Sequence, residues 1–413
     1  MPENTKAHRL ARMTGRNPHE SHRTATPLEL LFDLTFVIAI GQASGQFSHL
    51  IAEAHFGAAL GAFGFAVFAI VWAWINFTWF ASAYDTDDWF YRVTTMVQMV
   101  GVIVLALGLP ALFHSINEGE HLDNRVLVIG YVVMRVALVL QWLRAAKQDP
   151  ERRATALAYA KYVSIAQLGW IIVAIIDLEF WPTILCSFVL FAIEMAGPVL
   201  AERKTSGTPW HPHHIAERFG LLAIITLGEG IFGTVASVSA IVEEQSWSME
   251  AVLIIVAGIG LTFGLWWNYF IIPSGDALAK FRTKAWVWGY GHMFIFGSIA
   301  ATGAGLHVAA YVIEGESELG HVGAVLAVAI PVLIFCVALF ALYGFLVGAF
   351  DPFHIGLMAG CIAVVLFAVA VTAAGASIGI GLIVVMLAPA VIVVGYETIG
   401  HRHEARVMER LRS

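Results

Sequence analysis

Residues 57–82 read GAALGAFGFAVFAIVWAWINFTWFAS and contain no Asp, Glu, Lys or Arg. About 20 apolar residues in helical form span the hydrocarbon core of a bilayer. Similar stretches recur along the whole chain of 413 residues, of which 59% are hydrophobic and only 13% charged. A soluble domain carries about 25% charged residues, so this composition cannot supply a water-exposed surface. The sequence therefore predicts an integral membrane protein.

Short polar or Pro- and Gly-containing segments separate the apolar stretches, which predicts an all-α polytopic transmembrane helix bundle of about twelve helices. The first 25 residues are polar and basic and lack the apolar core of a secretory signal peptide. The first apolar segment is therefore expected to be a membrane helix itself. The expected helices lie at 27–50, 57–82, 91–113, 126–146, 157–177, 180–200, 214–241, 250–272, 285–312, 321–349, 354–374 and 377–398.

Lys and Arg fall in alternate connecting segments, which indicates the orientation because basic loops stay in the cytoplasm. Basic residues mark the N-terminal tail, Arg92, the segment 144–161, the pair 203–204, the segment 280–284 and the C-terminal tail, whereas the alternate loops carry acids and only Arg125 departs from the pattern. Both termini are therefore expected in the cytoplasm. The lipid bilayer is the expected partner, and no run of like charge is long enough for a nucleic-acid-binding arm.

Short motifs recur in the two halves of the chain. Residues 74–77 (WINF) end the second expected helix and residues 266–269 (WWNY) end the eighth, so Asn76 and Asn268 hold matching positions. Six helices per half is an even number, which predicts repeats of parallel topology related by an axis along the membrane normal. The expected organisation is an N-terminal tail at 1–26, a first six-helix repeat at 27–200, a linker at 201–213, a second repeat at 214–398 and a tail at 399–413.

Two acids open the first expected helix. Pro27 suits a first helical turn, and Glu29 and Asp33 are four residues apart, which places both carboxylates on one face. Capping of the helix N-terminus is one explanation of Glu29, but it explains Asp33 less well because Asp33 lies deeper in the apolar run. Both residues are therefore candidates for binding an ion or a polar solute.

A second polar group opens the seventh expected helix. His214, Glu217 and Arg218 lie in its first turns. Glu229 follows Glu217 at a distance of about 18 Å along the helix, which places it near the middle of the membrane between two glycines. A carboxylate there is either functional or hydrogen-bonded statically to a neighbouring helix.

Other polar side chains lie inside the expected helices. Arg135 is about 15 Å deep and requires a counter-charge, for which Glu194 and Glu229 are the candidates. A static buried ion pair is the alternative interpretation. The candidate ion-binding or substrate-binding residues are Glu29, Asp33, Asn76, Arg135, Glu194, Glu217, Arg218, Glu229, Asn268 and His292.

Few other chemistries are indicated, and no cofactor is expected. His214 and Glu217 are weak metal-ligand candidates, because no second His or Cys pair completes a site. No lysine lies mid-membrane, which excludes a retinal Schiff base, and neither a Walker A loop nor an HExxH motif is present. Cys186, Cys336 and Cys361 lie singly in apolar runs, so packed thiols rather than disulfides are expected.

Two strings resemble the signatures of the bacterial low temperature requirement A family: PLELLFDLTFV at 27–37, and HIAERFG at 214–220 followed by LGE at 227–229. The WINF motif and the acidic segment 85–88 after it are similar to this family as well, and the resemblance covers about residues 24–400. It implies a multi-helix protein of the bacterial cytoplasmic (inner) membrane. The family is named for a growth phenotype, so the resemblance implies no reaction.

These residues favour a transporter or channel-like protein that moves a small ion or polar solute through a midplane site between the two repeats. Glu229, Asp33 and Arg135 would form or gate the site, and a desolvated Glu229 would couple transport to protons. The first alternative is an enzyme that acts on lipid at the cytoplasmic interface with Glu29, Asp33 and His214. The second is a sensor or assembly protein whose charges are structural. A homo-oligomer is compatible with each.

Overall fold

A computed structural model describes residues 10–18, 20, 23–176, 178–204, 207–348 and 352–400. The expected C-terminal tail, 399–413, therefore lies largely outside the described residues, and the expected N-terminal tail, 1–26, lies outside them in part. In the described part of the chain the secondary structure is helical, and its β content is one isolated bridge between His121 and Glu179.

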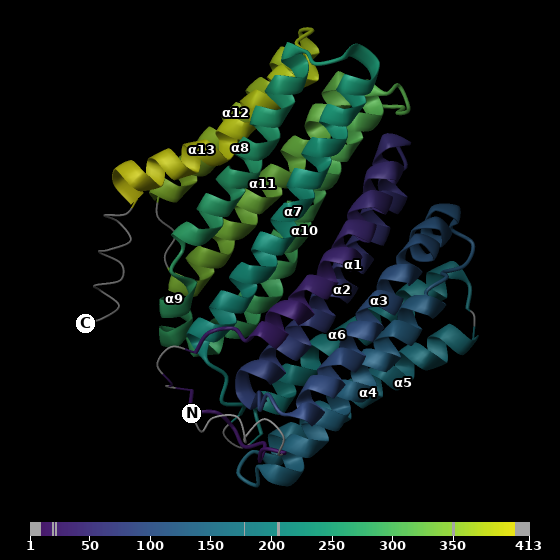
Figure 1. Cartoon of the computed structure of the whole chain (residues 1–413), viewed down its shortest axis with the longest axis vertical. Helices are drawn as coiled ribbons and strands as arrows, with labels where there is room; N and C mark the ends of the chain where they lie inside the picture. Colours follow the sequence, from purple (N-terminus) through teal and green to yellow (C-terminus); the bar gives the residue numbers. More distant parts are fainter. Residues whose placement is uncertain are drawn as a thin grey trace, which may run out of the picture. The chain divides into compact units, whose positions relative to one another are not determined.

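Twelve of the described helices are long and apolar enough to cross a membrane, which confirms the predicted all-α membrane bundle (Figure 1). They are α1 (Pro27–Ala52), α2 (Phe56–Tyr84), α3 (Trp89–Glu118), α4 (Arg125–Gln148), α5 (Arg153–Ile176), α6 (Phe180–Glu202), α7 (Pro212–Gln245), α8 (Met249–Ile271), α10 (Ala285–Ile313), α11 (His321–Val347), α12 (Pro352–Ala373) and α13 (Ile378–Gly395). Three shorter elements complete the set: α9 (Ser274–Lys280), the 3₁₀ turn η1 (Arg282–Lys284) and the π turn η2 (Tyr396–Gly400).

The chain divides into two compact units. The first comprises the described residues up to Gln46 together with Leu60–Leu221 and Leu278–Arg282. The second comprises Phe47–Ala59, Leu222–Ala277 and the described residues from Thr283 onward. This division does not test the two-fold repeat of six-helix halves, which stays a prediction.

In the first unit, helices that follow one another in the chain pack together, α3 against α4, α4 against α5 and α5 against α6. Glycines let the α3 and α4 backbones approach closely. A Cβ added at Gly108 would lie 2.5 Å from the backbone nitrogen of Leu127, and one at Gly130 would lie 2.5 Å from that of Leu105. Small residues at helix crossings are the usual means of close packing in lipid.

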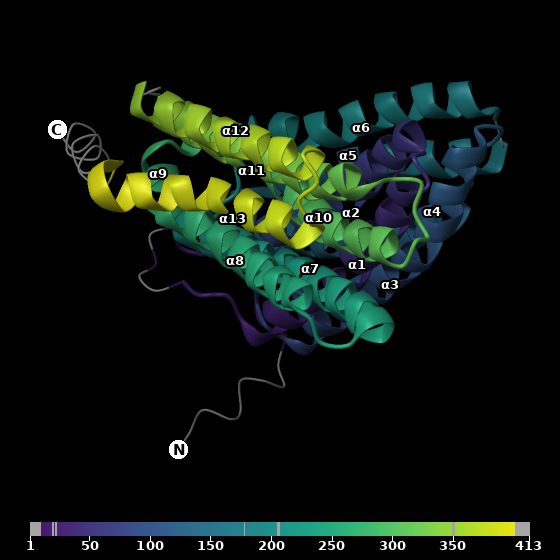
Figure 2. The ribbon, with the colours of Figure 1, turned by 90° about the horizontal axis from the view of Figure 1, so that it is seen from above.

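In the second unit, α10 packs on α11, and α13 packs on α8, α11 and α12. Figure 2 shows α13 running beside α8 and α12. Close approach again depends on small residues, since a Cβ added at Gly305 of α10 would lie 2.3 Å from the carbonyl oxygen of Ala327 on α11.

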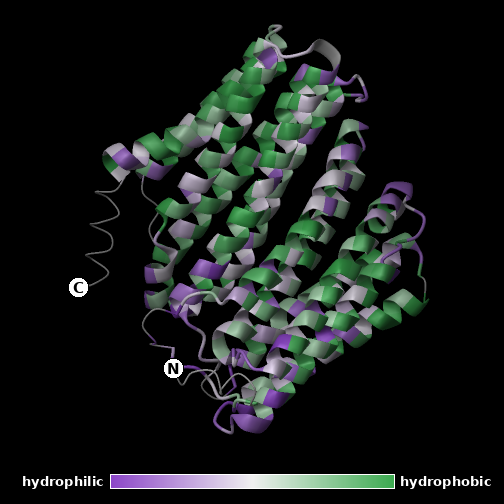
Figure 3. Ribbon diagram, in the orientation of Figure 1, coloured by the Kyte–Doolittle hydropathy of each residue, from purple (hydrophilic) through white to green (hydrophobic). Residues whose placement is uncertain are grey.

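Large apolar side chains also point out of the helices. Leu107, Ile175 and Leu185 are 70%, 75% and 67% exposed. Figure 3 shows hydrophobic residues along the helix bodies and hydrophilic residues gathered near several helix ends and connections. Exposed apolar surface on this scale is costly in water and is favourable in lipid, so the helix bodies are the membrane-facing part of the chain.

Candidate functional site

The polar first turns of α1 and α7 form ion pairs buried inside the first unit. Arg218 on α7 contacts both acids of α1. Its Nη1 lies 3.0 Å from Glu29 Oε1, its Nε donates to Asp33 Oδ2 at 3.2 Å, and its Nη2 donates to Asp33 Oδ1. His214 Nε2 lies 3.2 Å from the Glu29 carboxylate. All four side chains are 0% exposed, so no solvent screens these charges.

Helix periodicity explains this arrangement. Glu29 and Asp33 are four residues apart on α1, and His214 and Arg218 are four residues apart on α7, so each pair lies on one helix face. Pro27 and Pro212 open the two helices, as proline suits a first turn. The structure therefore brings together four of the side chains that the sequence singled out.

Glu29 also caps its own helix. The backbone nitrogen of Thr26 donates to Glu29 Oε2 at 2.7 Å, and the backbone nitrogen of Glu29 donates to Thr26 Oγ1 at 3.3 Å. This reciprocal arrangement is a capping box. The capping interpretation of Glu29 is therefore confirmed, and its ion-binding role stays a prediction.

An aromatic wall stands beside Asp33. The indole Nε1 of Trp74 donates to Asp33 Oδ1 at 2.6 Å. The Arg218 guanidinium carbon lies 5.7 Å from the Trp74 ring centre and 5.9 Å from that of Phe77. Cation–π attraction at such distances adds to the ion pair and favours Arg.

Two further charged groups belong to this site, although they were absent from the residues predicted for it. Arg23 Nη2 lies 3.9 Å from both Glu29 Oε1 and Asp85 Oδ2, and it donates to the carbonyl oxygen of Ala81 at 3.0 Å. Burial lowers the pKa of Arg23. Burial, and next the charge of Glu29, raise the pKa of Asp85 to about 6. We call the following residues the buried ion cluster: Arg23, Glu29, Asp33, Asp85, His214 and Arg218.

The buried ion cluster has unequal numbers of opposite charges. Its three carboxylates face two guanidinium groups and one imidazole. With a neutral imidazole and ionised carboxylates, the cluster carries one net negative charge. An uncompensated charge in a dry interior is expensive. The buried ion cluster therefore holds one more carboxylate than guanidinium groups.

Arg135 forms a separate buried ion pair. Its Nη2 lies 3.2 Å from Glu194 Oε2, and both side chains are at most 3% exposed. Trp72 Nε1 donates to the same carboxylate oxygen at 2.6 Å, and the Arg135 guanidinium lies 5.1 Å from the Tyr131 ring centre. Of the two candidate counter-charges for Arg135, the structure shows this contact with Glu194.

Glu229 lies in the second unit, in the middle of α7, and is 5% exposed. A Cβ added at Gly303 of α10 would lie 2.6 Å from the Glu229 Cβ, and one at Gly230 would lie 2.6 Å from Thr262 Oγ1 on α8. The space beside Gly230 is therefore filled by protein, whereas nothing lies within 4 Å of a Cβ added at Gly228. An ion-binding role for Glu229 stays a prediction.

The remaining polar candidates make ordinary internal hydrogen bonds. Asn76 donates to the carbonyl oxygen of Trp72 at 2.7 Å, and Asn268 donates to that of Pro389 at 3.1 Å. His292 Nε2 lies 3.1 Å from the Tyr269 hydroxyl, and its Nδ1 lies 2.8 Å from the Trp288 carbonyl oxygen. These contacts link neighbouring turns or helices and do not join the buried ion cluster.

The two weak metal-ligand candidates have different partners. His214 faces Glu29, whereas Glu217 Oε2 accepts a hydrogen bond from the backbone nitrogen of Ala25 at 3.2 Å. Among the described residues, no group of three or more His, Cys, Asp or Glu side chains could hold a metal ion.

Comparisons with known proteins identify the family of the chain. A sequence model of the family described as "Bacterial low temperature requirement A protein" matches residues 24–389. An uncharacterized protein of Rhizobium meliloti (strain 1021) is 27% identical over 296 residues, which is 67% of each chain. No solved structure matches. Because the family match covers most of the sequence, the chain belongs to the bacterial low temperature requirement A family.

Proposed function

We propose that this membrane protein transports a small ion or polar solute and that protons move with it through the buried ion cluster. The observation that carries this proposal is the burial of six ionisable side chains in one group, four of them 0% exposed, in or beside apolar helices. Charged groups at membrane depth are expensive and mark ion pathways and proton relays in transporters.

The unequal charge count supports proton coupling. One proton added to the cluster cancels its net negative charge and so changes the field at the Arg218 contacts with Glu29 and Asp33. Asp85, with its pKa raised to about 6, is suited to exchange a proton near neutral pH. If a substrate cation and a proton neutralise the same negative charge, binding of one disfavours binding of the other. This competition is the basis of coupled exchange.

The burial of these groups disfavours the two alternatives. A lipid-directed enzyme requires carboxylates that reach lipid, whereas Glu29, Asp33 and His214 are 0% exposed. A purely structural cluster would be expected to balance its charges, because an unpaired buried charge destabilises the fold.

We also propose in which membrane the chain lies and how it is oriented there. The distribution of Lys and Arg favours the bacterial inner membrane with both termini and the segment 144–161 in the cytoplasm. Single cysteines introduced at Glu151 and Glu118 test this orientation with a membrane-impermeant thiol reagent. We expect labelling of Glu118→Cys in intact cells and labelling of Glu151→Cys only after lysis, and the reverse pattern would exclude this topology.

Proton movement is measured with the full chain in liposomes that contain a pH-sensitive dye, with potassium and valinomycin present to clamp the membrane potential. After a pH jump we expect the gradient to collapse faster than in empty liposomes. The backbone nitrogen of Asp87 donates to Asp85 Oδ1 at 2.9 Å. Asp85→Asn keeps the size of the side chain and an oxygen that can accept this hydrogen bond, but it removes the titratable proton. This variant should lose at least about 90% of the protein-dependent flux.

Asp87→Asn is the matched control. Asp87 lies two residues away, its side chain is 51% exposed, and Asn tolerates its positive φ of 47°. This variant should keep the wild-type flux. Equal flux in liposomes with Asp85→Asn and wild-type protein, at equal folded amounts, would refute the assignment of the proton pathway to the cluster.

A further inference from the structure

Several buried polar atoms of the buried ion cluster make no hydrogen bond to the protein. Among the described residues these atoms include Arg23 Nε, Glu29 Oε1 and Asp85 Oδ2. Arg23 Nη2 lies 3.9 Å from each of the two carboxylate oxygens, which is beyond the roughly 3.2 Å of a hydrogen bond. A buried donor or acceptor without a partner is costly, so one donor and two acceptors remain to be satisfied at this place.

Tyr91, in the first turn of α3, brings a fourth such atom to the same place. Its side chain is 0% exposed, and its hydroxyl makes no hydrogen bond to the described residues. Of the charges that act on this hydroxyl, those of Asp85 and Glu29 are the strongest. The Tyr91 ring packs against Phe77, whose ring centre lies 5.9 Å from the Arg218 guanidinium carbon. Tyr91 is therefore a neighbour of the buried ion cluster that the ion pairs alone do not reveal.

The four atoms together require a guest that both donates and accepts hydrogen bonds. Asp85 Oδ2 and Glu29 Oε1 only accept, Arg23 Nε only donates, and the Tyr91 hydroxyl can do both. A metal cation would leave Arg23 Nε without an acceptor, and an anion would leave the carboxylate oxygens without a donor. Water satisfies both kinds of group, and a buried water typically makes about three hydrogen bonds to such atoms.

We propose that the Tyr91 hydroxyl and Arg23 Nε hold a water molecule against Asp85 Oδ2, and that this water carries the proton of Asp85. The proton that leaves the Asp85 carboxyl binds to the water oxygen while the water gives one of its own protons to Glu29 Oε1, so the water is regenerated and Tyr91 keeps its proton. Tyr91 acts through the water and is a positioning residue. This inference rests on the proposed proton flux through the buried ion cluster.

Infrared spectroscopy of the full chain in detergent measures the titration of Asp85, whose protonated carboxyl gives the C=O band that Asp85→Asn lacks. The charges of Glu29, Arg23 and Arg16 also act on Asp85, and Tyr91→Phe leaves all three in place. A hydrogen bond to a carboxylate lowers its pKa. Loss of the hydroxyl should therefore raise the midpoint from the wild-type pKa of about 6 by about one pH unit.

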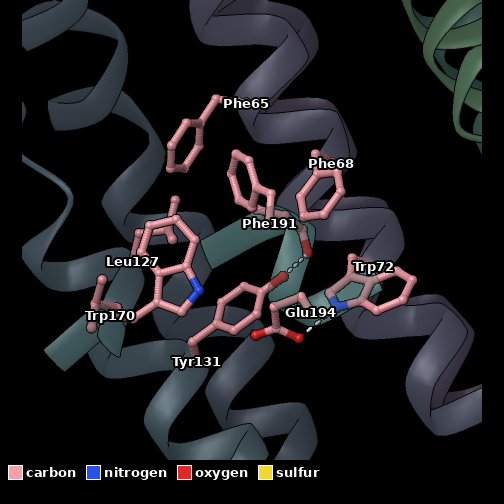
Figure 4. A pocket seen from close by; sticks show the side chains of 10 residues that line it. Phe65, Phe68, Trp72, Leu127, Tyr131, Trp170, Phe191 and Glu194 are labelled. Carbon is pink, nitrogen blue, oxygen red and sulfur yellow. Dashed lines mark hydrogen bonds between the residues drawn. The ribbon is translucent and has the colours of Figure 1, made fainter. Parts of the chain in front are cut away.

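The liposome assay measures whether the water carries the proton. Tyr91→Phe keeps the ring and should slow the protein-dependent flux at least about tenfold. Tyr131→Phe is the matched control, because Tyr131 is also buried and lies beside another acid, Glu194, in the aromatic pocket of Figure 4. Its hydroxyl donates to the carbonyl oxygen of Ala69 and not to the buried ion cluster. The control should match the wild type in both flux and the Asp85 midpoint.

The two measurements separate this inference from the proposed function. An unchanged Asp85 midpoint in folded Tyr91→Phe would overturn the water site, and a raised midpoint with wild-type flux would overturn the role of the water in proton transfer. Arg23→Lys, which keeps the charge but removes Nε, should also raise the midpoint and serves as the test if Tyr91→Phe does not fold. Absence of flux in the wild type would refute the proposed function, whereas the infrared titration would still decide whether Tyr91 holds a water against Asp85.

Discussion

The two compact units bury charge very differently. Within the described residues, the first unit buries nine Asp, Glu or Arg side chains, whereas the second buries one, Glu229. The second unit nevertheless packs its helices closely through small residues such as Gly303 and Gly305. A membrane helix bundle of this kind therefore does not need buried ion pairs in order to pack. This contrast supports a functional reason for the charges of the first unit.

The largest effect is expected at the centre of the buried ion cluster. Arg218→Gln leaves Glu29 and Asp33 without their shared cation, which should lower the free energy of unfolding by about 3–5 kcal/mol. Unfolding with a denaturing detergent in mixed micelles measures this change. Arg92→Gln is the control, because its side chain is 52% exposed and should contribute less than about 1 kcal/mol. A normal stability for Arg218→Gln would show that the first unit does not rely on this pairing.

Breaking the separate Arg135–Glu194 ion pair should lower the free energy of unfolding somewhat less, and a second substitution should restore it. Arg135→Gln strands the Glu194 carboxylate and should cost about 3 kcal/mol. Adding Glu194→Gln removes the stranded charge, so the double variant should regain most of that stability. A double-mutant cycle in the same unfolding assay gives the coupling energy. Additive losses would mean that the two side chains do not stabilise each other.

The pH dependence of stability should reveal the contribution of Asp85 to the buried ion cluster. The folded pKa of Asp85 is about 6, above the value of about 3.9 for an unfolded Asp. Its contribution is therefore fully present below about pH 4 and is lost as the pH rises through 6, to a total of about 2–3 kcal/mol. Thermal unfolding between pH 4 and 8 should show this loss in the wild type and a flatter profile in Asp85→Asn. Identical profiles would contradict the raised pKa.

The smallest change in stability is expected in the second unit. Glu229→Gln keeps the size and hydrogen bonding of the side chain and should cost about 1 kcal/mol or less. If Glu229 serves transport, as its place in the middle of α7 suggests, the variant should fold normally but lose flux in the liposome assay. Normal folding with full flux would remove Glu229 from the site and would sharpen the contrast between the units.

The sequence was a good guide to helices and to paired positions within one helix. Apolar length predicts twelve membrane helices, and four-residue spacing places Glu29 beside Asp33. Partners across helices were harder to predict. Arg135 had two candidate counter-charges, and only packing shows its contact with Glu194.

The sequence indicates the other residues that contact the buried acids only weakly. Arg23 and Asp85 lie outside the apolar runs and read as ordinary loop charges, yet the fold buries both to less than 8% exposure. Trp72 and Trp74 each direct an indole N–H to a buried carboxylate, Glu194 and Asp33 respectively. The need of a buried indole for an acceptor was the available signal, but it does not say which acid will accept.

The sequence by itself determined that this chain is a helical membrane protein, because lipid leaves no alternative for uncharged segments of this length. Its motifs, and not this physical constraint, identify the low temperature requirement A family. Only the tertiary structure decided that Arg218 joins two acids from another helix, that Arg23 and Asp85 complete the cluster, and that Arg135 pairs with Glu194. Helix periodicity acts within one segment, whereas these contacts depend on which faces of distant helices pack together.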